Sequence, residues 1–356
     1  MINQIKPVIG KISKIKAINY IKSDAWLTEH KLTEEFEKKF AKFTNSKYCI
    51  TFPNGTLTMS SILDCLDIGK NDEVLVSNYT MVATANVAHM VKASPVLVDI
   101  SKHDLCMCPQ DLDKKINKKS KVVIYTEMNG RVGQIDKIRK ICKKNNLFLI
   151  EDSAHSIGSY NKKIHTGNSG IAGSFSFSMP KLITMGQGGA VITNNKKLEK
   201  NLRLYKNFGR SKSGTDIHNH IGYNFKITDL QAVIGLGQLV DIEKRIIIKK
   251  KIFKRYKKNL KDNKRIKIFQ VSSNETPWSV DIYLNDPKKL KKKLEKIKIH
   301  TRLVYPPLNS QKIYKKIKGL PISNYFCNRG LWLPSSLDIS NKEIDYICKK
   351  INKIIK

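Results

Sequence analysis

The sequence predicts an α/β fold, with a large domain built on a mostly parallel central sheet flanked by helices and a smaller C-terminal α+β domain. Through the first half of the chain, short β-branched runs alternate with segments of helical period, which is typical of parallel sheets covered on both faces. The last hundred residues lose this alternation. We place the boundary after residue 245, which divides the chain into 1–245 and 246–356, and this length suffices to bury one large and one small core.

Each expected element rests on its own pattern. The candidate strands are residues 48–52, 73–77, 95–100, 121–126, 147–152, 174–178 and 190–193. Apolar residues at helical spacing predict one helix around Phe36 and another over residues 135–145. A long helical stretch over residues 228–260 leads away from the large domain. The final helix begins at a capping box, because Ser340 and Glu343 precede an apolar periodic run.

The net charge of +36 raises the hypothesis of a nucleic-acid-binding protein. The excess is nearly all lysine, and its densest run lies over residues 285–300. Within that run Leu290, Leu294 and Ile297 recur at helical spacing, so we expect its lysines on the solvent side of an amphipathic helix. No arginine-rich arm, helix-turn-helix or zinc finger accompanies the charge. We therefore expect a solvated surface and no nucleic-acid partner.

Composition also bears on compartment, membrane and metal. No stretch approaches the roughly 20 apolar residues that a membrane helix needs, and residues 1–19 space their lysines among isoleucines, so we expect neither membrane insertion nor a secretory signal. The seven cysteines are scattered, and only Cys106 and Cys108 lie close together. No second pair or histidine cluster completes a metal site. These patterns favour a cytoplasmic protein with reduced thiols and no metal.

Three loops after candidate strands hold the residues of chemical interest, because open α/β sheets bind ligands at the carboxyl ends of their strands. In the first loop, Gly55 would let the backbone approach a phosphate. The helix that follows offers free N–H groups and the Thr56 hydroxyl to the phosphate oxygens. Taken alone, such a turn usually does no more than cap its helix.

The second loop follows an apolar strand that ends in Glu151 and Asp152. Asp152 could bind a metal, act as a base or cap the next helix, and an isolated aspartate most often caps. His155 is equally open, because hydrogen-bonded structural histidines are commoner than catalytic ones.

The third loop contains Lys181, which follows a β-type run and Pro180 and precedes the glycine-rich stretch 186–189. A lysine in this chain is by default a surface residue, but one placed between two strands is held out of water. Desolvation would lower the pKa of its amine, as a Schiff-base nucleophile requires.

The three loops together are more specific than any one of them. A phosphate turn, a strand-end Asp152 and then Lys181 about thirty residues later match the needs of pyridoxal 5′-phosphate (PLP). That cofactor requires a helix N-terminus for its phosphate, a carboxylate for its pyridine nitrogen and an amine for its aldehyde.

Over almost its whole length the chain resembles the DegT/DnrJ/EryC1/StrS sugar aminotransferases, which have PLP-dependent transferase fold type I. The matching motifs are Asn54-Gly55-Thr56, Asp72-Glu73-Val74, Tyr79-Thr80-Met81-Val82-Ala83-Thr84, Glu151-Asp152, Ser174 to Lys181 with Gly186-Gln187-Gly188-Gly189, Gly222-Tyr223-Asn224-Phe225-Lys226 and Thr228-Asp229-Leu230-Gln231-Ala232.

The resemblance implies a role for each cofactor-site residue. Lys181 would form the Schiff base and act as general base, and Asp152 would pair with the pyridinium nitrogen. Gly55, Thr56, the Leu57 amide and Ser176 would bind the phosphate.

Met81 would cover the cofactor face where the family usually has an aromatic ring. His155 would face the phenolic oxygen, where glutamine is commonest. Asn224 would reach the phosphate of a neighbouring subunit, which implies a homodimer with shared active sites.

Segments 129–131, 301–308 and 329–335 are similar to those of the perosamine-synthase-like branch. The implied reaction moves an amino group from an amino acid, by family habit L-glutamate, to C4 of a nucleotide-linked 4-keto-6-deoxyhexose, for surface polysaccharide or O-antigen synthesis. Lys226, Arg302 and Tyr305 would bind this substrate, although Lys226 and Arg302 could equally be ordinary surface charges. A 3-keto sugar, a UDP- or dTDP-linked sugar, and a catalytically silent regulatory protein of this fold remain alternatives.

Overall fold

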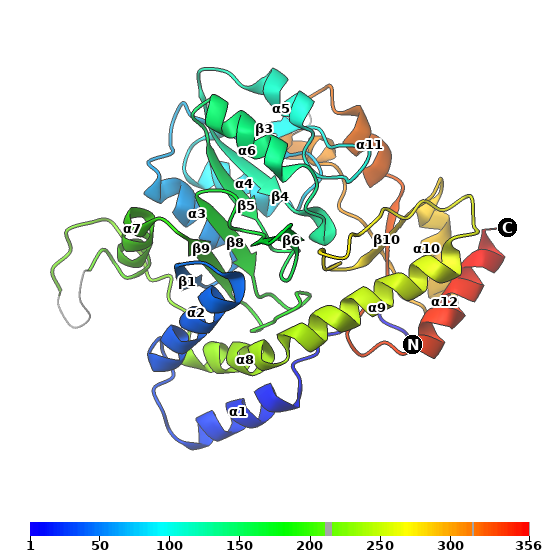
Figure 1. Cartoon of the computed structure of the whole chain (residues 1–356), viewed down its shortest axis with the longest axis horizontal. Helices are drawn as coiled ribbons and strands as arrows, with labels where there is room; N and C mark the ends of the chain where they lie inside the picture. Colours follow the sequence, from blue (N-terminus) through cyan, green and yellow to red (C-terminus); the bar gives the residue numbers. More distant parts are fainter. Residues whose placement is uncertain (211–215, 315–316, 356) are drawn as a thin grey trace.

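The structure, a computed structural model, describes residues 1–210, 216–314 and 317–355. Its centre is a seven-stranded sheet (Figure 1). In spatial order the strands are β1 (Tyr48–Phe52), β9 (Gly189–Thr193), β8 (Ala172–Ser176), β5 (Phe148–Asp152), β4 (Ser120–Thr126), β2 (Glu73–Ser77) and β3 (Ser94–Val98). All neighbours run parallel except β9, which is antiparallel to both β1 and β8. The mostly parallel sheet is therefore confirmed.

Helices cover both faces of this sheet. Within β1, Ile50 and Phe52 point to one face and Cys49 to the other, as the period of a strand requires. The first face packs against α3 (Gly55–Cys65), α4 (Ala83–Met90) and α7 (Lys196–Lys206). The second packs against α2 (Lys31–Thr44), α5 (Pro109–Lys115), α6 (Ile135–Lys144) and α8 (Asp229–Val240), and α1 (Lys11–Lys22) lies on α8. Two short strands, β6 (Tyr160–Asn161) and β7 (Ile164–His165), form a separate hairpin.

The helical stretch expected over residues 228–260 is present, but it is divided into two helices. The chain forms α8 and then α9 (Ile242–Leu260), with Asp241 between them at φ −97° and ψ 5°. Apolar periodicity continues across Asp241, so the sequence pattern does not show the break. Figure 1 shows α9 leading from α8 to the C-terminal unit.

The C-terminal unit holds a three-stranded antiparallel sheet of β10 (Val280–Tyr283), β12 (Gly330–Leu333) and β11 (Arg302–Leu303). This sheet packs against α9, α10 (Pro287–Lys296) and α12 (Asn341–Ile354). The lysine-rich run forms α10, whose Leu290 and Leu294 are buried, and α12 begins at the expected capping box of Ser340 and Glu343. Both predictions are confirmed, except that Ile297 lies just after the end of α10 and is 37% exposed.

Other segments of the C-terminal half return to the large sheet. They include the short turns η2 (Leu308–Ser310) and η3 (Lys312–Tyr314) and the helix α11 (Pro321–Cys327), while η1 (Met128–Gly130) belongs to the large unit. Leu308 and Leu320 join the core of the large sheet. Along α9, Ile246 packs in the large unit and Phe253 in the C-terminal core. The boundary after residue 245 thus falls inside a continuous helix and stays a prediction.

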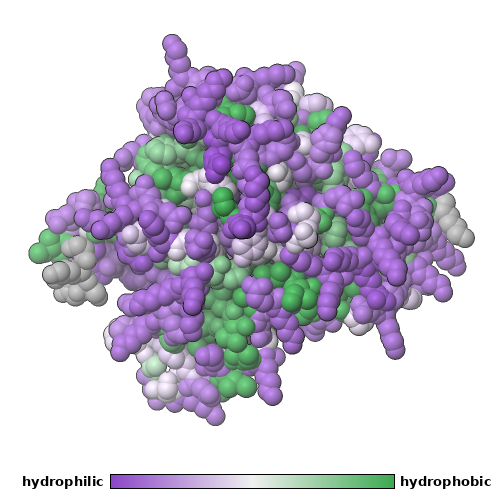
Figure 2. Space-filling model, viewed as in Figure 1, coloured by the Kyte–Doolittle hydropathy of each residue, from purple (hydrophilic) through white to green (hydrophobic). Residues whose placement is uncertain are grey.

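The surface and the cysteines follow the composition. Figure 2 shows hydrophilic residues over most of one face, with a hydrophobic strip in its lower middle, over α8. Across residues 1–210, 216–314 and 317–355, no helix has the length and hydrophobicity to span a bilayer. No group of three metal-ligating side chains occurs in the same residues, and the seven cysteines are free thiols.

Candidate active site

A cavity of about 340 Å³ opens at the carboxyl ends of the parallel strands. All three loops singled out in the sequence line it, through the segments 54–56, 152–155 and 176–187. Arg302 and Tyr305 of the C-terminal unit close one side. The loops are far apart in sequence but meet here because parallel strands end at the same edge of the sheet.

One corner of the cavity lies at the N-terminus of α3. The Asn54 side chain caps α3, where its Oδ1 accepts hydrogen bonds from the amides of Thr56 (3.0 Å) and Leu57 (2.9 Å). Gly55 lies so close to β8 that an added Cβ would sit 3.0 Å from the Ser176 Cβ. The helix N-terminus and two hydroxyl side chains, Thr56 and Ser176, therefore share one corner, whereas the Leu57 side chain does not line the cavity.

Asp152 ends β5 and is 5% exposed. Its carboxylate accepts hydrogen bonds from the Thr84 hydroxyl (2.7 Å) and the Ala154 amide (3.3 Å). Burial raises the pKa of Asp152, while the Thr84 hydroxyl and the positive charge of Lys181 oppose this rise. The side chain is thus a desolvated carboxylate in a fixed orientation, suited to face a cationic group.

Lys181 lies in the loop after β8, and its side chain is half-buried. Burial lowers the pKa of its amine to about 8; Asp152 acts to raise this pKa and Arg302 to lower it. The direction is the one expected from the sequence. An amine of this pKa is partly unprotonated near neutral pH, so it can act as a nucleophile or a base.

His155 is buried beside Lys181 and stacks on Trp278, with ring centroids 4.1 Å apart and planes 6° apart. Burial and the charges of Lys181 and Arg302 hold the pKa of His155 well below its usual range, so the imidazole is neutral. Its Nδ1 has no hydrogen-bond partner within the described residues. A buried ring nitrogen left unpaired in the cavity wall fits a ligand with a hydrogen-bonding group.

The outer part of the cavity is lined by Met81, Arg302 and Tyr305. Met81 is 45% exposed, and its sulfur accepts a hydrogen bond from the Ala83 amide (3.0 Å). The Arg302 guanidinium lies 5.5 Å from the Tyr305 ring centroid. Burial raises the pKa of Tyr305 to about 12, so its hydroxyl is neutral. Arg302 is exposed and leaves a positive charge at the cavity entrance.

Two predicted site residues lie outside this cavity. Asn224 is exposed and forms a β-bridge with Asn207. The Lys226 ammonium donates to the Asn207 side chain (3.2 Å) and lies 4.4 Å from the Phe208 ring centroid. Within one chain, neither residue lines the cavity that contains Lys181.

Three residues at or beside the site had not been predicted from the sequence: Thr84, Thr126 and Trp278. Thr84 is the last residue of a family motif, but the motif did not reveal its bond to Asp152. Thr126 continues the same hydroxyl network through Thr80, whose Oγ1 lies 2.9 Å from that of Thr84 and 3.2 Å from that of Thr126. Trp278 is far from the three loops in sequence, and nothing in its local sequence indicated a role in the site.

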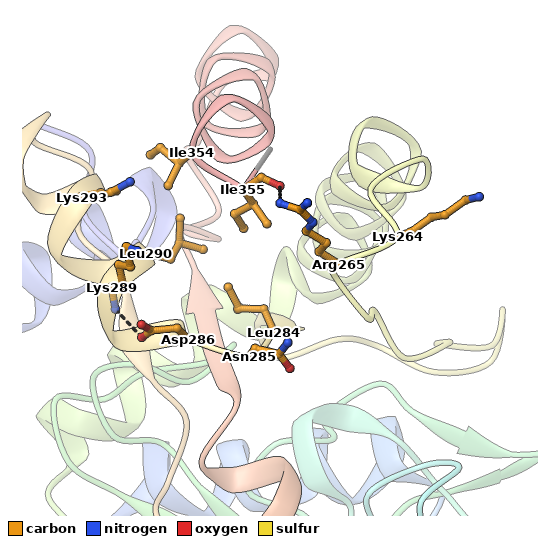
Figure 3. Close-up of a pocket in the computed structure, with 10 residues that line it drawn as sticks. All are labelled: Lys264, Arg265, Leu284, Asn285, Asp286, Lys289, Leu290, Lys293, Ile354 and Ile355. Atoms are coloured by element: carbon orange, nitrogen blue, oxygen red, sulfur yellow. Dashed lines mark hydrogen bonds between the residues drawn. The ribbon is translucent and has the colours of Figure 1, made fainter.

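A larger cavity of about 550 Å³ lies in the C-terminal unit, between α10 and the end of α12 (Figure 3). Four lysine or arginine side chains line it, as is common in so lysine-rich a chain. Figure 3 shows Lys264 pointing away from the other labelled side chains and Arg265 pointing toward Ile355, whose carbonyl oxygen is 3.5 Å away. None of the residues discussed above for catalysis lines it, and we assign the chemistry to the smaller cavity.

The smaller cavity fits PLP by the chemistry of its side chains. The corner around Thr56 and Ser176 suits a phosphate, and the oriented carboxylate of Asp152 suits a protonated ring nitrogen. The amine of Lys181 suits an aldehyde, and the unpaired nitrogen of His155 suits a phenolic oxygen.

Comparison with known proteins agrees with this chemistry. The family model of the DegT/DnrJ/EryC1/StrS aminotransferases matches residues 9–352. GDP-perosamine synthase of Escherichia coli O157:H7 is 32% identical over 343 residues, which is 94% of each chain. A DegT DnrJ EryC1 StrS aminotransferase of Brucella abortus is 27% identical, with a TM-score of 0.90 over 96% of this chain and 95% of that one. A Streptococcus pneumoniae structure solved in its PLP-form, 23% identical, has the same fold, with a TM-score of 0.93 over 99% and 97% of the two chains. The chain therefore belongs to the DegT/DnrJ/EryC1/StrS aminotransferase family of PLP-dependent sugar aminotransferases.

Proposed function

We propose that the protein transfers an amino group from L-glutamate to C4 of a GDP-linked 4-keto-6-deoxyhexose. The observation that carries the proposal is the meeting of Asp152, Lys181 and the N-terminus of α3 in one cavity. The choice of acceptor is supported by the similarity to GDP-perosamine synthase. We place the enzyme in the cytoplasm, where its product would enter surface polysaccharide synthesis.

Bound PLP would supply an aldehyde carbon that accepts the amino group and a ring that accepts electrons. Lys181 would hold the cofactor and, once released, would take a proton from the α-carbon of the donor. A pKa of about 8 leaves part of its amine free for this work. Asp152, fixed by Thr84, would keep a proton on the pyridine nitrogen. His155 would bond the phenolic oxygen.

The remaining predicted residues would serve the phosphate, the cofactor face and the acceptor. The phosphate would be bound by Gly55, Thr56, the Leu57 amide and Ser176. Met81 would cover the cofactor ring. Arg302 and Tyr305 would bind the acceptor, with Arg302 toward its diphosphate. The places of the other residues around the cavity support these assignments. The Leu57 amide donates to the Asn54 side chain in this structure, so its proposed bond to the phosphate would have to share or replace that bond.

Asn224 and Lys226 would act across a subunit boundary. They lie outside the cavity of their own chain, so their proposed roles require a second copy whose cavity they reach. We therefore propose a homodimer with shared active sites. A mixture of inactive Lys181→Ala and Asn224→Ala subunits should regain activity through hybrid dimers, and no recovery after subunit exchange would contradict the sharing.

The reaction can be tested with purified protein, L-glutamate and a panel of nucleotide-linked 3-keto and 4-keto sugars, with the products identified by NMR. We expect amination at C4 of the GDP-linked sugar. Lys181→Ala should abolish turnover, and Lys163→Ala, which changes an exposed lysine of the β6–β7 hairpin, should not. Activity on 3-keto sugars alone would defeat the C4 assignment, and wild-type turnover by Lys181→Ala would defeat the role of the lysine.

A further inference from the structure

Trp278 joins the C-terminal unit to the catalytic loop. The residue lies just before β10 and is 4% exposed. Its indole Nε1 donates a hydrogen bond to the carbonyl oxygen of Pro180 at 2.8 Å. The acceptor belongs to the residue directly before Lys181, so this bond fixes the main chain from which the catalytic side chain extends.

The same ring contacts two more groups of the site. The Lys181 Nζ lies 5.0 Å from the Trp278 ring centroid, within the range of a cation–π interaction. The imidazole of His155 stacks on it at 4.1 Å, almost parallel. One side chain therefore touches the main chain before the lysine, the amine itself and the neutral histidine beside it.

We propose that Trp278 is a positioning residue of the aminotransferase site. It anchors the loop of Lys181 through Pro180, holds the Lys181 side-chain nitrogen against its ring and fixes the plane of the His155 imidazole. This inference rests on the proposed role of Lys181. It adds a residue from outside the three cofactor-binding loops. Through Trp278, the C-terminal unit would contribute to the geometry of the reacting amine as well as to acceptor binding.

The electrostatic consequence has a definite sign. The electron-rich face of an indole stabilises an ammonium ion more than a neutral amine, so it raises the pKa of a nearby lysine. The charged groups around Lys181 are Asp152, which also raises this pKa, and Arg302, which lowers it. Two more titratable side chains lie near Lys181: Lys249, which lines a small cavity beside it, and His155, which is neutral. Replacing the ring with an apolar side chain that keeps water out of the site should therefore lower the pKa of Lys181 further.

Two variants separate the contacts, and a third serves as the control. Trp278→Phe keeps an aromatic face but loses the N–H donor, whereas Trp278→Leu loses both. Trp332→Phe is the matched control, because Trp332 is fully buried, packs edge-on to Trp278 and has no partner for its Nε1 among the described residues. Its ring also contacts Arg302 and Tyr305, and phenylalanine keeps an aromatic ring at that place. Urea unfolding of all three variants would show which of them are folded.

The first measurement is the pKa of Lys181 in the cofactor-free full-length chain, obtained from the pH dependence of its acetylation by mass spectrometry. We expect Trp278→Leu to lower this pKa by about half a unit or more. Trp278→Phe should cause a smaller fall, and Trp332→Phe none. An unchanged or raised pKa in the Trp278 variants, or an equal fall in Trp332→Phe, would overturn the proposal.

The second measurement is hydrogen exchange of the Lys181 amide, which donates to the Ser178 carbonyl (3.0 Å). Loss of the Trp278–Pro180 bond in Trp278→Phe should speed this exchange about fivefold. Wild-type exchange in that variant would refute the anchoring. Neither readout needs bound cofactor, so failure here is distinct from failure of the proposed function. The latter would appear as a borohydride-reduced holoprotein without a pyridoxyl adduct on Lys181.

Discussion

Lys249→Met should stabilise the fold, and the gain should depend on pH. Lys249 projects from α9 and is only 6% exposed. Its ammonium donates one hydrogen bond, to the Ser335 carbonyl (2.8 Å), and no carboxylate pairs with it among the described residues. Burial lowers the pKa of this amine to about 7. The folded chain therefore carries the cost of a buried cation that water would otherwise solvate.

The size and sign of this cost follow from linkage. In the unfolded chain the lysine titrates near its ordinary value of about 10.4. A fall from there to about 7 corresponds to roughly 4–5 kcal/mol against folding, present in full below pH 7. Between pH 7 and about 10.4 only the unfolded state keeps the proton, so stability rises with pH through this window. Methionine avoids this cost. It leaves the Ser335 carbonyl unpaired, however, which lowers the free energy of unfolding by roughly 1–3 kcal/mol.

Urea unfolding at pH 6 and pH 9.5 would measure the effect. The expected gain for Lys249→Met is about 2 kcal/mol at pH 6, shrinking toward zero or below at pH 9.5. Lys251→Met, which changes an exposed lysine on the same helix, controls for the added apolar side chain. A Lys249→Met protein less stable than wild type at pH 6, or a difference that does not vary with pH, would show that Lys249 is not a buried, costly cation.

Three further outcomes are expected. Gly189→Ala would place a Cβ 2.6 Å from the Asn54 carbonyl carbon, so PLP affinity should fall at least about tenfold in equilibrium dialysis, and unchanged affinity would contradict a rigid phosphate turn. Arg131→Met leaves Asp281 buried without its partner and should cost about 3–5 kcal/mol in urea unfolding, part of which Arg131→Met/Asp281→Leu should recover. Asp152→Asn should reduce kcat by about 10²–10⁴-fold while borohydride still traps the cofactor, and near-normal kcat would remove its role.

The sequence predicted the sheet well because its strands are short apolar runs between helices. The expected strand 147–152 differs from β5 by one residue, and 174–178 is displaced by two from β8. The meeting of the three loops also followed from the sequence, since strand ends share an edge in a parallel sheet. Strand order did not follow, because a run such as β9 has the same composition whether its neighbours are parallel or antiparallel.

Contacts made by single residues were harder to predict. The break at Asp241 is hidden by continuous apolar periodicity, and nothing local to Trp278 indicates that its indole reaches Pro180. Such contacts are set by tertiary packing between distant segments. Predictions from periodicity therefore located the elements, whereas the contacts around Lys181 could be identified only in the three-dimensional structure.

The motif at residues 129–131 shows how these two kinds of information meet. From the sequence it marked similarity to one branch of the family, and the structure gives it a mechanical role. The main-chain carbonyl of Asn129 accepts a hydrogen bond from the Trp278 amide (3.3 Å). The side-chain oxygen of Asn129 accepts a hydrogen bond from the Ser279 amide (2.9 Å). Arg131 forms a fully buried ion pair with Asp281 at 2.5 Å. Each bond holds the segment around Trp278 against the large unit.

This junction bears on the proposed positioning of Lys181 by Trp278. If the Asn129 turn sets the place of Trp278, weakening it should disturb Lys181 without touching the cavity. Asn129→Ala removes the side-chain bonds to Ser279 and Asp281 and leaves the indole intact. The pKa of Lys181 should then move in the same direction as in Trp278→Leu but by less. A pKa that stays at the wild-type value would mean that Trp278 is held in place by its own packing alone.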